Sequence, residues 1–177
     1  MNKVLVIGNG GSGKSTFSKR LSARLGLPLV HLDGHYWRPG WSATPKEEWL
    51  LTVERLVGAE RWVMDGNYGG TMRRRMEAAD TIIYLDVSRV TCILGVLKRR
   101  IFGKRADEIP GCRERLDLEF LKWIWNYPRK NRPTILRLLE EFRSSKRVIV
   151  LRSRNSVHLF SSQLESDTRG RNSSGPE

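Results

Sequence analysis

A glycine-rich segment between an expected strand and an expected helix constrains this chain more than any other feature. Residues 3–7 are almost entirely apolar, which is typical of a short buried strand. Residues 16–25 carry an apolar side chain at every fourth position, which predicts a helix with one apolar face. Between them, residues 8–15 have the pattern G-x-x-x-x-G-K-S. This pattern, between a strand and a helix, predicts a phosphate-binding loop.

Each part of this loop suits a bound phosphate. Its glycines let backbone N–H groups converge on an anion, and the start of the helix adds unpaired N–H donors and the positive end of a dipole. We expect Lys14 to reach the β- and γ-phosphates and the Ser15 hydroxyl to bind Mg²⁺. The sequence therefore predicts a nucleoside triphosphate, held by Gly8, Gly10, Gly11, Ser12, Gly13, Lys14, Ser15 and Thr16.

Short apolar strands alternate with helices along the rest of the chain, whose 177 residues suit one α/β domain. Five such strands predict a doubly wound parallel sheet with helices on both faces, in three layers. They are expected at residues 3–7, 29–33, 61–65, 81–86 and 147–151.

The remaining segments set the expected domain boundaries. We expect one kinase-like domain over residues 1–164 and a disordered, Ser/Gly/Arg/Asn-rich tail over residues 165–177. A helix over residues 116–127 is expected to stop at Pro128 and to resume near Pro133. The chain has no apolar run of the ~20 residues that span a membrane, no room for a signal peptide before residue 3, and two isolated cysteines. We therefore expect a cytoplasmic protein.

Aspartates stand at the ends of three expected strands. In open parallel sheets, ligands bind outside the carboxyl ends of the strands, and phosphoryl transfer needs a carboxylate near the metal and a group that orients the acceptor. We expect Asp65 to hold Mg²⁺ together with Ser15, and Asp33 to act on the acceptor. Each carboxylate could instead cap the turn or helix that follows. This alternative is favoured for Asp86, which precedes Ser88 and an expected helix.

Basic residues bracket residues 103–116, a polar segment that we expect to form a small lid. Planar guanidinium groups match the oxygens of a phosphoryl group in transit, and a closing lid would exclude water. Arg100, Arg105 and Arg113 are the expected catalytic arginines. The alternative is a solvated charged face. The net charge of +13 also attracts nucleic acid without regard to its sequence.

Aromatic residues follow Asp33 where an acceptor would enter. Tyr36, Trp37 and Trp41, beside His35, could stack against a base or anchor an extended loop in the core, and the sequence leaves both open. His31, within an apolar strand, is expected to be an interior histidine with a hydrogen-bond partner.

Several stretches together resemble one family. The stretches GNGGSGKST, LDGHYWRPGW, VMDGNY and IIYLDVSR, and the arginine-rich segment before FLKWIWNYP, follow in order over roughly residues 3–154. They resemble the DNA topology modulation proteins, small P-loop proteins similar in fold to adenylate kinase. The phosphate loop is shared by many unrelated proteins, whereas LDGHYWRPGW combined with DGNY is more specific.

This resemblance implies a sheet ordered 2-3-1-4-5, ATP on the loop, and an acceptor pocket near Asp33 and Asp65. Asp65 and the glycine after it stand where kinases of this fold carry an Asp-Gly that helps to hold Mg²⁺. Nucleotide kinases continue with Phe-Pro-Arg, which grips the acceptor phosphate, but here residues 67–69 read Asn-Tyr-Gly. An AMP acceptor bound in the usual way is therefore not expected, although Arg73 or Arg74 could replace that arginine.

We expect an ATP-dependent kinase that acts on a small acceptor, such as a nucleoside, a nucleotide or another metabolite. The alternative is a nucleic-acid-associated ATP-binding protein that modulates DNA topology. The charge fits this alternative, but the sequence shows no helix-turn-helix, zinc finger or other reading module. The identity of the acceptor and the oligomeric state stay open.

Overall fold

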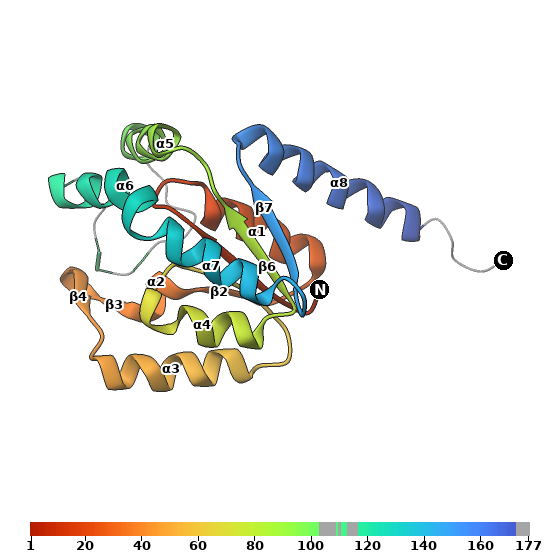
Figure 1. Cartoon of the computed structure of the whole chain (residues 1–177), viewed down its shortest axis with the longest axis horizontal. Helices are drawn as coiled ribbons and strands as arrows, with labels where there is room; N and C mark the ends of the chain where they lie inside the picture. The colour runs from red at the N-terminus through yellow and green to blue at the C-terminus, as the bar shows by residue number, and fades with distance from the viewer. Residues whose placement is uncertain (103–108, 110, 113–116, 173–177) are drawn as a thin grey trace.

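Five parallel strands form the central sheet of the structure, a computed structural model that describes residues 1–102, 109, 111, 112 and 117–172, with side chains through residue 164 (Figure 1). The sheet order is β2-β5-β1-β6-β7, and every pairing is parallel. Counted among these strands alone, the order is 2-3-1-4-5, as predicted. The strands are β1 (Lys3–Gly8), β2 (Leu29–His31), β5 (Trp62–Asp65), β6 (Thr81–Leu85) and β7 (Arg147–Leu151).

The apolar runs of the central strands are explained by burial on both faces of the sheet. Successive side chains of β1 point to opposite faces. Leu5 and Ile7 pack in the core cluster that α3 (Lys46–Gly58), α4 (Gly69–Ala78) and α7 (Arg132–Phe142) complete. Val4 and Val6 pack in the cluster completed by α1 (Lys14–Leu25) and α8 (Arg154–Asn172). The three-layer α/β architecture is therefore confirmed (Figure 1).

Two further helices lie beside the glycine-rich loop. Helices α5 (Arg89–Phe102) and α6 (Leu118–Lys130) pack against each other through a separate small cluster that contains Cys92, Val96 and Ile124. This pair lies above the sheet in Figure 1, next to the start of α1. The fold thus places two helices against the loop from the β6 side.

Helix α6 runs through Pro128, so the prediction that the helix stops there is wrong. Proline lacks the N–H that would bond to the carbonyl four residues earlier, which is that of Ile124. In the structure the Asn9 side chain donates to this Ile124 carbonyl at 3.0 Å. The helix therefore tolerates the proline because the glycine-rich loop satisfies the carbonyl that the proline leaves without a donor.

The segment after β2 has more structure than the loop expected from the sequence. Strand β2 ends at His31, where its pairing with β5 ends, so Asp33 lies in the first turn of α2 (Leu32–Tyr36). The next residues form a small antiparallel pair, β3 (Trp37–Arg38) with β4 (Ser42–Ala43), joined by the 3-10 turn η1 (Pro39–Trp41). Strand β2 therefore ends two residues before Asp33, where the sequence predicted its end.

The C-terminal helix differs from the expected disordered tail. Helix α8 continues through residues 165–172, because its earlier turns are anchored on α1 by Val157, Phe160 and Leu164, and an anchored helix extends at little cost. Residues 173–177 lie outside the described part, as does most of the expected lid. No helix among the described residues is long and apolar enough to cross a membrane.

Candidate active site

The glycine-rich loop between β1 and α1 is built on close contacts that only glycine permits. A Cβ on Gly11 would lie 2.1 Å from the Cys92 carbonyl oxygen of α5, and Gly11 has φ +74°. A Cβ on Gly8 would lie 2.9 Å from the Leu85 carbonyl oxygen. Gly13 also has positive φ, at +92°, and forms the N-cap of α1. The loop therefore takes its shape from neighbouring backbone on β6 and α5.

The hydrogen-bond donors of this loop suit a bound anion. Lys14 is the first residue of α1 and is half-buried, followed by Ser15 and the exposed Thr16 in the first helical turn. The Ser12 hydroxyl is buried and has no hydrogen-bond partner within the described residues. A buried hydroxyl in this state is unusual and fits a site for a polar ligand. These residues suit the phosphates that the sequence predicts.

Helix α6 covers the loop from one side. The Asn9 side chain accepts from the Gly10 N–H at 2.8 Å and donates to the Ile124 carbonyl at 3.0 Å. A Cβ on Gly10 would meet Phe120 at 3.0 Å and Trp123 at 3.2 Å. The sequence pattern did not predict this contribution of α6. The signal in the sequence is Pro128, because a proline inside a helix leaves one carbonyl of that helix in need of another donor.

Asp65 is buried at the carboxyl end of β5 and contacts the neighbouring strand. Its Oδ1 lies 2.9 Å from Nδ1 of His31, the residue opposite it in the β2–β5 register. Its Oδ2 is buried without a hydrogen-bond partner within the described residues. Because Mg²⁺ usually keeps several waters and takes one or two carboxylates, Asp65 fits the predicted role beside Ser15. His31 was predicted to have a hydrogen-bond partner. In the structure that partner is Asp65, the carboxylate expected to bind Mg²⁺.

Asp33 is held by a tyrosine from the loop after β5. The Tyr68 hydroxyl donates to Asp33 Oδ1 at 2.6 Å. Burial and the Asp33 charge raise the pKa of Tyr68 well above its usual range, so the phenol stays protonated and keeps donating. The structure thus brings Asp33 and Asp65 to the same edge of the sheet, as the strand order predicts.

A buried arginine shapes the loop that carries Tyr68. The guanidinium of Arg75 donates to the carbonyls of Gly66, Asn67 and Tyr68 at 2.9, 2.5 and 2.9 Å. Burial lowers the pKa of Arg75 to about 9, which still leaves it protonated at neutral pH. Arg75 was not among the predicted site residues, although its spacing from Met72 places it on the buried face of α4.

The two arginines that sequence analysis named beside it are engaged elsewhere. Arg73 forms a two-pronged ion pair with Glu141 on α7, and Arg74 pairs with Glu54 on α3. Both arginines are exposed. Of these three arginines, Arg75 is the buried one, and it binds backbone carbonyls of the protein itself.

Asp86 does not cap α5, and that prediction is wrong. Both its oxygens accept from Arg132 on α7, at 2.8 and 2.9 Å. Ser88 alone supplies the expected cap, accepting from the Thr91 N–H at 3.2 Å. The carboxylate prefers the guanidinium because a two-pronged charged pair is stronger than a single bond to an amide.

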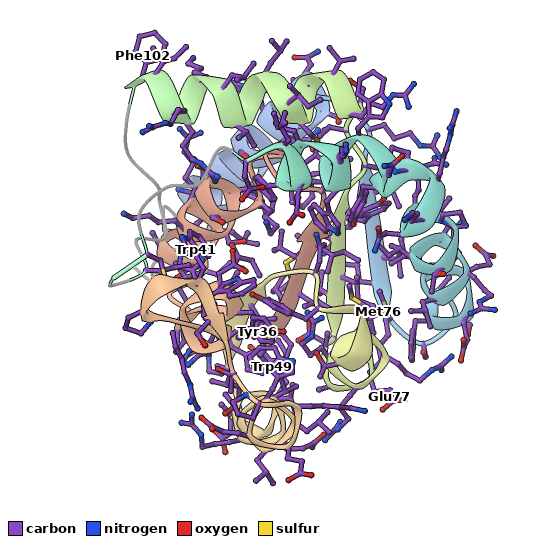
Figure 2. All side chains as sticks on the ribbon, turned by 90° about the vertical axis from the view of Figure 1, so that its left-hand side faces the viewer. Tyr36, Trp41, Trp49, Met76, Glu77 and Phe102 are labelled. Carbon is purple, nitrogen blue, oxygen red and sulfur yellow. The ribbon has the colours of Figure 1, made fainter. Side chains whose placement is uncertain are left out.

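The aromatic cluster has an inner and an outer part, joined by a contact between Tyr36 and Trp37 at 4.9 Å. Tyr36, Trp49 and Tyr68 contact one another with ring centroids 4.6–5.0 Å apart and pack on the main core. Trp37 and Trp41 contact each other at 5.6 Å and are half-exposed. Figure 2 shows Tyr36 beside Trp49, with Trp41 set apart from both. The core-anchor interpretation therefore holds for Tyr36, and Trp37 and Trp41 lie partly exposed at the edge of the cluster.

The expected catalytic arginines are not placed in the site by the described residues. Arg100 is exposed on the last turn of α5. Arg105 and Arg113 lie outside the described residues, within the expected lid. Their roles stay predictions.

Comparisons with known proteins show the fold. No family model matches this chain, and no curated protein sequence matches it either. A shikimate kinase from Acinetobacter baumannii, solved in complex with shikimate, superposes with a TM-score of 0.60 at 12% identity, covering 97% of this chain and 94% of that one. A shikimate kinase from Bacteroides thetaiotaomicron gives 0.51 at 16% identity, covering 94% and 97%. The chain therefore has the α/β P-loop fold seen in these kinases.

Proposed function

We propose that this chain is an ATP-dependent kinase that transfers the γ-phosphoryl group to a hydroxyl of a small acceptor. One observation carries this proposal. The glycine-rich loop, whose buried Ser12 hydroxyl has no hydrogen-bond partner in the described part of the chain, lies at the same edge of the sheet as Asp33 and Asp65, and both carboxylates are held by side chains. The fold shared with small-molecule kinases supports it.

The loop and α1 bind the triphosphate in this proposal. Backbone N–H groups of the loop and the Lys14 ammonium hold the β- and γ-phosphates. Ser15 and Asp65 hold Mg²⁺, which when bound neutralises the charge that develops on those phosphates. His31 fixes the orientation of the Asp65 carboxylate through its 2.9 Å contact. Helix α6 shields one side of the loop from water.

Asp33 acts on the acceptor. Its carboxylate orients the acceptor hydroxyl and takes its proton while the new oxygen–phosphorus bond forms and the bond to the ADP oxygen breaks. Tyr68 keeps Asp33 in place through the 2.6 Å hydrogen bond. Arg100, Arg105 and Arg113 stay the proposed arginines that neutralise the phosphoryl group in transit.

Acceptor-dependent formation of ADP tests the proposal. Purified protein with Mg²⁺ and ATP is assayed against nucleosides, nucleotides, sugars and small alcohols, with the Lys14→Ala variant as control. We expect turnover with at least one acceptor class, little ATP hydrolysis without an acceptor, and loss of turnover in the variant. Absence of ADP formation across the panel, or unchanged turnover in Lys14→Ala, would contradict the proposal.

The second candidate function is nucleic-acid-associated, as the resemblance to DNA topology modulation proteins implies. The net charge of +13 favours it, and α5 carries four basic residues and no acidic one. A supercoiling assay in moderate salt, with and without ATP, compares the wild type with Lys14→Ala. A change in topology that requires both ATP and Lys14 would support this function, whereas salt-sensitive retention on DNA alone would not.

A further inference from the structure

Residues 66–68, which follow β5, contact both the glycine-rich loop and the segment that carries Asp33. The Asn67 side chain accepts from the N–H of Gly8, the first glycine of the glycine-rich loop, at 3.2 Å. The Tyr68 hydroxyl donates to Asp33 at 2.6 Å. We call residues 66–68 the bridging loop. Two consecutive residues of this short loop therefore contact the two halves of the proposed site.

The Asn67 side chain stands in for a backbone acceptor of the sheet. The Gly66 N–H donates to the Val6 carbonyl at 3.3 Å, which extends the β1–β5 ladder beyond the end of β5. Continued by two residues along β1, this parallel ladder would pair the Gly8 N–H with the Gly66 carbonyl. Arg75 binds that carbonyl instead, at 2.9 Å, and the Asn67 side chain accepts from Gly8. The start of the glycine-rich loop is therefore held by a side chain where the sheet would supply a carbonyl.

Helix α6 also holds the Asn67 side chain. The Tyr127 hydroxyl donates to Asn67 Oδ1 at 3.3 Å. Burial raises the pKa of Tyr127 well above its usual range, so the phenol stays protonated and keeps donating. One donor from β1 and one from α6 thus converge on the same amide oxygen and fix its orientation.

Arg75 fixes the backbone of the bridging loop. Its guanidinium donates to the carbonyls of all three residues, at 2.9, 2.5 and 2.9 Å. Tyr68 has φ +30°, a conformation that bulky residues rarely adopt and that persists only where the surrounding structure holds it. A movement of Asn67 therefore displaces the same clamped backbone that carries Tyr68.

We propose that Asn67 and Tyr68 are positioning residues for phosphoryl transfer, which together set the glycine-rich loop and Asp33 relative to each other. In this proposal neither residue touches the reacting atoms. Asn67 acts through the loop that binds the triphosphate, and Tyr68 acts through Asp33. The inference rests on the proposed kinase function and adds how the two halves of its site are aligned. Alignment matters because a misplacement of about 1 Å can cost about 100-fold in rate.

The split between kcat and KM tests this positioning role. Asn67→Leu removes the acceptor oxygen from a side chain of similar size, and Tyr68→Phe removes the hydroxyl and keeps the ring. With a compound of the acceptor panel that supports turnover, each variant should lower kcat at least about tenfold and change the KM for ATP much less. Because both residues serve one alignment, the double variant should be about as slow as the slower single variant. Effects on kcat that multiply, or a change in the KM for ATP alone, would overturn the inference.

Thr81→Val is the matched control for a loss of stability. Thr81 is buried at the start of β6, at the opposite edge of the sheet, and its hydroxyl donates to Asp80 at 2.7 Å. The variant loses a hydrogen bond of a buried side chain and should keep its kcat. A kcat as low as that of Asn67→Leu would assign the effect to stability and overturn the inference.

Hydrogen exchange tests the link between the two halves without any acceptor. The full-length protein is compared with and without Mg²⁺ and a non-hydrolysable ATP analogue, in peptides that cover residues 29–45. The bound analogue should slow exchange around Asp33, because the bridging loop joins this segment to the glycine-rich loop. Asn67→Leu and Tyr68→Phe should lose this slowing and still bind the analogue in calorimetry. Tyr68→Phe removes a single oxygen atom, so it carries the test alone if Asn67→Leu does not fold. The absence of slowing in the wild type, or the same slowing in a folded variant, would overturn the inference.

Binding of the analogue separates failure of this inference from failure of the proposed function. A folded wild type that does not bind the analogue, or that forms ADP with no acceptor of the panel, would contradict the kinase function itself. Binding and turnover that are the same in the wild type and both variants would overturn the positioning role and leave the kinase function standing.

Discussion

Replacing Gly11 by alanine should destabilise the protein through a contact that the structure shows directly. The new Cβ would lie 2.1 Å from the Cys92 carbonyl oxygen and 2.8 Å from a methyl group of Val96. The carbonyl is part of the backbone of α5 and has no flexible end that could move aside. The substitution therefore forces either the loop or the helix to shift.

The expected loss of stability in Gly11→Ala has two contributions. A non-glycine residue at φ +74° costs about 1–2 kcal/mol, and overpacking against a fixed neighbour costs about 1–3 kcal/mol. Gly11→Ala should therefore lower the free energy of unfolding by about 2–5 kcal/mol. Gly13→Ala is the matched control, because Gly13 has φ +92° but no atom within 4 Å of its Cβ position, so only the first term applies.

The same contact can be tested from the opposite side. A Cβ on Gly95 of α5 would lie 2.3 Å from the Gly11 carbonyl oxygen. Helix propensity alone predicts that Gly95→Ala stabilises the protein by about 1 kcal/mol, whereas the clash predicts net destabilisation. The sign of this change therefore separates the two effects.

Urea unfolding, followed by tryptophan fluorescence and circular dichroism, gives the free energy of unfolding of the three variants and the wild type. The values are compared where the dependence of this free energy on urea concentration is the same. Calorimetry with Mg²⁺ and an ATP analogue should show weaker binding in Gly11→Ala than in Gly13→Ala, because the clash displaces the loop. Equal stability of these two variants, or a stabilising Gly95→Ala, would refute the packing of α5 on the loop.

Three further predictions concern individual side chains. Lys14→Ala should lower kcat at least about 100-fold with the fold intact, measured by ADP formation and circular dichroism. Asp33→Asn should abolish transfer and leave ATP affinity nearly unchanged, and a matching loss of ATP affinity would instead place Asp33 beside the metal. Arg75→Met should lower the free energy of unfolding by about 2–4 kcal/mol, measured in urea, because carbonyls that bind the guanidinium lose their donors; a neutral effect would contradict this.

Local pattern was sufficient to predict the core of the fold. The alternation of apolar strands with helices predicted the parallel sheet, its order came from the family resemblance, and the eight-residue glycine pattern predicted the loop. These features depend on residues close together in sequence, whose periodicity and spacing are visible without coordinates. The placement of Asp33 and Asp65 at one edge of the sheet followed from the strand order.

The sequence by itself thus determined the sheet, the phosphate loop and the edge that carries the aspartates. Only the tertiary structure decided the partners of those groups: His31 for Asp65, Tyr68 for Asp33, and Arg75 for the loop between them. The first two pairs join residues 34 and 35 positions apart, on different elements. Such pairings depend on how whole helices and strands pack, because many polar side chains of similar chemistry compete for each partner and only burial and distance in the folded chain select among them.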